Sequence, residues 1–68
     1  AGYAYYEKKD YNKALEYFEK SVPRYKKEKK YDYLEDAYTM IIQIYDEQGN
    51  EAKVNETIEA AKKELGKK

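Results

Sequence analysis

The chain has 68 residues, enough for one small domain and too few for a second hydrophobic core. Its 14 basic and 14 acidic side chains cancel, which argues against a strong nucleic-acid or membrane binder. The longest apolar run, Met40-Ile41-Ile42, is far shorter than a membrane span, and no signal-peptide pattern is present. With no cysteine either, we expect a soluble, cytoplasmic protein.

Residues suited to cap helix N-termini divide the chain into segments. Asp10, Asp32 and Asn50 each precede an apolar-periodic stretch, and their side-chain oxygens can accept from the first free amides of a helix. Asp32 has Glu35 three residues later, a pair that resembles a capping box. These residues therefore predict three helix starts.

Helix ends are indicated by Gly49 and Gly66, because glycine adopts the left-handed conformation of many helix C-termini at little cost. Inside the second segment, Pro23 removes one backbone donor, and we expect the helix to bend there and run on. The alternative is that residues 24–30 form a basic connector. The predicted helices are residues 1–9, 11–29, 33–48 and 51–65.

Apolar side chains recur at helical spacing in the last three segments, and no segment alternates for long as a strand would. The three stripes are Tyr11, Ala14, Leu15, Phe18, Val22 and Tyr25; Leu34, Ala37, Tyr38, Ile41 and Tyr45; and Val54, Ile58, Ala61 and Leu65. The sequence therefore predicts an all-α fold of four helices.

The chain also repeats itself when it is shifted by 40 residues. The shift aligns Tyr5 with Tyr45, Asp10 with Asn50, Ala14 with Val54, Phe18 with Ile58 and Ser21 with Ala61. Aromatic, capping, small and large positions coincide, which favours two copies of one helical unit over an unrelated set of helices.

These residues resemble the tetratricopeptide repeat, whose pattern is W-x2-L-G-x2-Y, then A-x3-F, then P. The first copy supplies Ala1-Gly2-x2-Tyr5 and Ala14-x3-Phe18, and the second supplies Tyr38-x2-Ile41-Ile42-x2-Tyr45 and Val54-x3-Ile58. The chain differs from the family in three ways: Ile42 replaces a glycine, Lys26 stands at the proline position, and the period is 40 residues rather than about 34.

The resemblance implies a single domain over residues 1–68, with one copy in residues 1–34 and another in residues 35–68. Each copy would be an antiparallel helix-turn-helix unit of an α-solenoid, and the stack would present a groove lined by the first helix of each unit. Because the first copy begins partway through the pattern, we expect the chain to be part of a longer array.

Family members commonly hold a peptide or a partner helix in that groove, so the resemblance implies a protein-interaction module. Matched position by position, the groove side chains would be Tyr3, Tyr6, Glu7, Asp36, Thr39, Gln43, Asp46 and Glu47. Carboxylates around phenol rings suit a basic partner, because a Lys or Arg cation can lie over a ring face. The alternative is that these acids form an ordinary solvated helix face, and Tyr5, Tyr11 and Tyr45 are expected to be packing residues.

Two other functions are considered. Residues 24–33 alternate basic and aromatic side chains, as a single-stranded nucleic-acid site would, but acidic residues interrupt the run, and we expect no nucleic-acid partner. The apolar ends of a short helical stack also allow self-assembly into a homo-oligomer.

Catalysis is not expected, because the chain lacks His and Cys and its one serine, Ser21, stands where the repeat requires a small buried residue. Neighbouring acids such as Asp46 and Glu47 point to different helix faces and do not match a calcium loop. We therefore expect no enzymatic activity, no cofactor and no metal.

Overall fold

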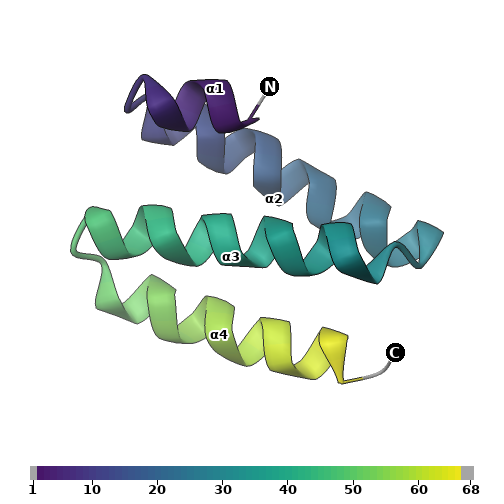
Figure 1. Ribbon diagram of the computed structural model, residues 1–68. Helices are drawn as coiled ribbons and strands as arrows, with labels where there is room; N and C mark the ends of the chain where they lie inside the picture. Colours follow the sequence, from purple (N-terminus) through teal and green to yellow (C-terminus); the bar gives the residue numbers. More distant parts are fainter. Residues whose placement is uncertain (1, 67–68) are drawn as a thin grey trace.

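The computed structural model describes residues 2–66, which form four helices joined by short turns, with no strand among them (Figure 1). The helices are α1 (Gly2–Glu7), α2 (Tyr11–Glu28), α3 (Tyr31–Glu47) and α4 (Glu51–Leu65). Each helix packs against the next in the chain, in a thin body of 32 × 25 × 14 Å. The all-α prediction is confirmed; Ala1, the predicted helix start, lies outside the described residues.

One backbone geometry serves all three turns. Lys9, Lys29 and Gly49, at intervals of 20 residues, adopt left-handed conformations with φ of 61°, 57° and 71°. At each turn the following amide donates to the carbonyl of a tyrosine five positions earlier, as in a Schellman motif. The donor and acceptor pairs are Asp10 and Tyr5, Lys30 and Tyr25, and Asn50 and Tyr45.

Two of the predicted N-caps are confirmed. The side chain of Asp10 accepts from the Lys13 amide at 3.3 Å, and that of Asn50 accepts from the Lys53 amide at 3.2 Å. Each bond satisfies one of the amides that a helix start leaves without a partner.

The predicted cap at Asp32 is wrong. Helix α3 begins two residues earlier than expected, at Tyr31, and its N-cap is Lys30, whose side chain makes no capping bond. The left-handed turn at Lys29 fixes where the chain reverses, so the capping preference of Asp32 is overruled. Asp32 lies instead in the first turn of α3, where a negative charge is stabilised by the helix dipole.

The two glycines predicted to end helices behave differently. Gly49 is left-handed, as expected, whereas Gly66 has φ of −68° and its amide continues the helical pattern by donating to the Lys62 carbonyl at 3.0 Å. The left-handed prediction for Gly66 is therefore wrong, whereas Gly49 stands where the chain reverses from α3 into α4.

The hydrophobic core lies between α2 and α3. Its buried apolar members are Ala14, Leu15, Phe18, Leu34, Ala37, Tyr38, Met40, Ile41 and Ile44. The predicted stripes of α2 and α3 are thus confirmed, with Met40 and Ile44 added to them. The α4 stripe is only half-buried, because α4 has no fully buried residue and packs mainly against α3.

Helix α2 is continuous at Pro23, and α1 approaches it closely at Gly2. Helix α2 continues through Pro23, which confirms the continuous helix and excludes a separate connector; the bend at Pro23 stays a prediction. Helix α1 approaches α2 so closely that a Cβ on the buried Gly2 would lie 2.4 Å from Tyr17 Cδ2 and 2.7 Å from Phe18 Cζ. Only a residue without a side chain permits this crossing.

Candidate functional site

The eight predicted contact residues fall into three groups. These are Tyr6, Gln43 and Glu47, which hydrogen-bond to one another; Tyr3 and Asp36, which line one cavity; and Glu7, Thr39 and Asp46, which are exposed. Helix α1 is thus hydrogen-bonded to α3 near the α1–α2 turn, and residues of both helices line a cavity further along.

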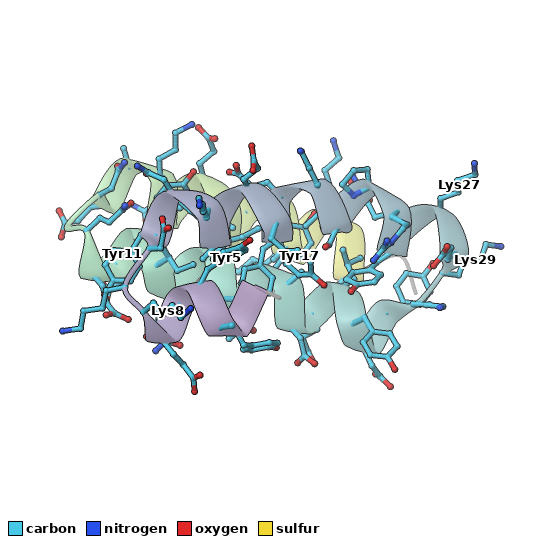
Figure 2. The ribbon with its side chains drawn as sticks, turned by 90° about the horizontal axis from the view of Figure 1, so that it is seen from above. Tyr5, Lys8, Tyr11, Tyr17, Lys27 and Lys29 are labelled. Atoms are coloured by element: carbon cyan, nitrogen blue, oxygen red, sulfur yellow. The ribbon has the colours of Figure 1, made fainter. Side chains whose placement is uncertain are left out.

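The first group, joined by Tyr11, forms a hydrogen-bonded cluster that we call the Glu47 network. The hydroxyl of Tyr6 donates to Glu47 Oε2, and the hydroxyl of Tyr11 donates to Glu47 Oε1 at 2.8 Å. Gln43 Nε2 donates in turn to the Tyr6 hydroxyl at 2.8 Å. One carboxylate of α3 is therefore bonded to both α1 and α2, near the turn where Figure 2 labels Tyr11.

These bonds favour the ionised carboxylate. The hydroxyls of Tyr6 and Tyr11 lower the pKa of Glu47, with a smaller contribution from the positive charge of Lys9. For the same reason the pKa values of Tyr6 and Tyr11 are raised, since each hydroxyl donates its proton to Glu47. Both carboxylate oxygens of Glu47 already accept hydrogen bonds from within the chain. A direct role for Glu47 in partner binding stays a prediction.

The second group belongs to a cavity of ≈ 250 Å³ where α1, α2 and α3 meet. Among its lining residues are Tyr3, Tyr17, Phe18, Tyr25, Tyr33 and Asp36, and we call it the tyrosine pocket. Its rings pack in pairs: Tyr3 and Tyr17 each meet Phe18 edge to face, with centroids 5.4 and 5.3 Å apart. Tyr25 and Tyr33 stack at 5.6 Å. The sequence did not single out Tyr17 or Tyr33 for this site.

The negative charge at the tyrosine pocket comes from Asp36, while Arg24 and Lys30 bring positive charge to the Tyr25 and Tyr33 rings. This carboxylate is exposed and has no basic side chain within 4 Å among residues 2–66. Burial is the main cause that raises the pKa of the Tyr3 hydroxyl, and the negative charge of Asp36 is the second cause. The site therefore combines aromatic rings with a negative charge that no cation of the described chain pairs with.

The predicted packing role holds for two of three tyrosines. Tyr11 and Tyr45 are half-buried against the core, and the Tyr45 hydroxyl also donates to Glu19 at 3.0 Å. Tyr5 is 38% exposed, so its assignment as a packing residue is wrong. Its ring instead lies 5.7 Å from the ammonium of Lys13 on α2.

Residues 24–33, considered above for nucleic-acid binding, contact one another. Tyr25 and Tyr33 stack together, the Arg24 guanidinium lies 5.3 Å from the Tyr25 centroid, and Lys30 Nζ lies 5.9 Å from the Tyr33 centroid. Lys30 also pairs with Glu28 at 3.5 Å. The rings and cations that would hold bases and phosphates are therefore already in contact with each other.

The one serine and the acidic side chains were considered above for catalysis and metal binding. Ser21 is 4% exposed, and its hydroxyl donates to the Tyr17 carbonyl at 2.9 Å, as expected of a small residue packed inside a helix pair. Within residues 2–66 no three His, Cys, Asp or Glu side chains come close enough together to hold a metal ion.

Comparison with known proteins gives no relative: no family model, curated protein or solved structure matches the chain significantly. None of the described helices is long and apolar enough to cross a membrane.

Proposed function

We propose that this chain is a tetratricopeptide-like, non-enzymatic interaction module that binds a basic peptide or partner helix in the groove between α1 and α3. The observation that carries the proposal is the tyrosine pocket, where the unpaired carboxylate of Asp36 lies beside exposed aromatic rings. Aromatic faces attract a Lys or Arg cation, and a nearby carboxylate adds charge complementarity.

The spacing of the proposed contact residues along α3 suits a short segment. Asp36, Thr39, Gln43 and Glu47 recur at helical spacing along one stripe of α3. From Asp36 to Glu47 the helix rises about 16 Å, which matches about five residues of extended peptide. The Glu47 network closes one end by fixing α1 on α3, and Asp36 marks the other end.

Anisotropy of a fluorescein-labelled Lys/Arg-rich peptide tests the proposal. Asp36→Lys should weaken binding at least about tenfold, because it replaces an attractive charge with a repulsive one. Glu35→Lys is the matched control: it makes the same charge change one residue earlier, about 100° around the helix. Equal effects of the two variants would mean that net charge, and not the groove, controls binding.

A second candidate function is self-assembly, and the state of α4 favours it. Val54, Ile58, Ala61 and Leu65 are only half-covered, so a further helix could bury more of the surface of α4. Sedimentation at several protein concentrations separates the two functions, because an adaptor keeps one mass whereas an assembling segment gains mass with concentration.

A further inference from the structure

The tyrosine pocket has the composition of a site for an organic cation, which makes the proposed function more specific. Rings from α1, α2 and α3 converge there: Tyr3 is 53% exposed and Tyr33 is 58% exposed, while Tyr17 and Tyr25 are half-buried. The cavity of ≈ 250 Å³ is far larger than the ~30 Å³ that one water molecule takes up in the liquid. The charged group of a small organic cation can therefore enter this cavity.

The same rings already attract the cations of the chain itself. Arg24 and Lys30 lie over Tyr25 and Tyr33 within 6 Å of the ring centroids, the range in which a ring face attracts positive charge. The charge of Lys30 is offset by its pairing with Glu28. Among residues 2–66 no cation lies over the Tyr3 or Tyr17 ring, so this part of the pocket is open to a ligand.

The polar groups of the pocket favour an alkylated ammonium over a bare one. An unmodified lysine ammonium is a compact, strongly hydrated charge with three donors, each of which needs an acceptor after it leaves water. Among the lining residues the Asp36 carboxylate is the one charged acceptor, and the tyrosine hydroxyls are neutral, weaker acceptors. Methyl groups remove donors and add apolar surface, which aromatic walls can cover without unpaired polar groups.

From this geometry we infer that the tyrosine pocket binds a quaternary ammonium group, with Asp36 as its counter-ion and the Tyr3 and Tyr17 rings beside it. The inference rests on the proposed function, in which the group belongs to a methylated lysine of a basic peptide. A free quaternary amine has the same chemistry and is separated from the peptide in the test.

The test is a set of NMR titrations of the full chain with four probes. These are tetramethylammonium chloride, a basic peptide with one trimethyl-lysine, the same peptide with unmodified lysine, and the same peptide with an uncharged tert-butyl isostere. The trimethyl-lysine peptide should bind at least about tenfold more tightly than both other peptides, and tetramethylammonium should shift Tyr3 and Asp36 resonances.

Two variants test the pocket itself. Tyr3→Leu removes a pocket ring that is 53% exposed, so the fold should persist while the preference for trimethyl-lysine is lost. Tyr5→Leu is the matched control, an exposed tyrosine two residues later on α1 and outside the tyrosine pocket, and should keep the preference. Loss of the preference in both variants, or in neither, would overturn the assignment of the site.

The outcomes separate this inference from the proposed function. Equal binding of the trimethyl, unmodified and tert-butyl peptides, all weakened by Asp36→Lys, would overturn the inference and leave the groove function intact. Binding of tetramethylammonium without any peptide would support the pocket for a free amine and overturn the peptide groove. Binding of none of the probes would overturn both.

Discussion

Replacing Lys29 with glycine should stabilise the fold, because the turn holds Lys29 in a conformation that glycine adopts without strain. Its φ of 57° and ψ of 34° are left-handed, where a residue with a Cβ is disfavoured by about 1–2 kcal/mol. The Lys29 side chain is exposed, so the substitution removes little packing. The greater freedom of glycine in the unfolded chain costs about 0.5–1 kcal/mol, which leaves a net gain of about 0.5–1 kcal/mol.

Urea and thermal unfolding followed by circular dichroism measure this gain. For a domain of this size the midpoint temperature should rise by about 2–8 °C. Lys27→Gly is the matched control: Lys27 lies two residues earlier, at the same end of α2 (Figure 2). It should destabilise by about 0.5–1 kcal/mol, because glycine is a poor residue inside a helix. If Lys29→Gly lowers stability as Lys27→Gly does, the left-handed turn is refuted.

Three further predictions concern packing and pH. Gly2→Ala should destabilise by about 1 kcal/mol in urea unfolding, because steric overlap with Tyr17 and Phe18, at about 1–3 kcal/mol, outweighs about 1 kcal/mol of improved helix propensity. A gain in stability would contradict the close crossing. Ile44→Val, at a position with 0% exposure, should cost about 0.5–1.5 kcal/mol in the same assay; a neutral result would argue against this core. Since the fold lowers the pKa of Glu47 from 4.5, its contribution to stability is present above pH 4.5 and is lost as the pH falls through the lowered value. Glu47→Gln should remove that part of the acid unfolding curve, and an unchanged curve would contradict the network.

The helices were predictable because their signals are local. Apolar spacing located the buried faces of α2 and α3, and the capping side chains of Asp10 and Asn50 marked two helix starts correctly. The start of α3 was missed because its turn depends on backbone bonds around Lys29, a residue type that rarely adopts a left-handed conformation. A signal for it exists in the sequence, since Tyr5, Tyr25 and Tyr45 recur every 20 residues, one before each turn.

The site was less predictable because its contacts join distant segments. Tyr6 and Glu47 are 41 residues apart, and sequence spacing alone gives neither the crossing of α1 over α3 nor the bond between them. Tyr11 was expected to pack, and it does, but its hydroxyl also holds Glu47. The tyrosine pocket likewise includes Tyr33. The position of this residue in the pocket is set by the turn between α2 and α3.

The most direct test of the groove is the amide NMR spectrum of labelled protein at two concentrations, recorded while a Lys/Arg-rich peptide is added at moderate salt. Our account predicts saturable shifts centred on Tyr3 and Asp36, the same at both protein concentrations. Shifts that follow dilution and ignore the peptide, or no shifts in α1 and α3, would contradict it.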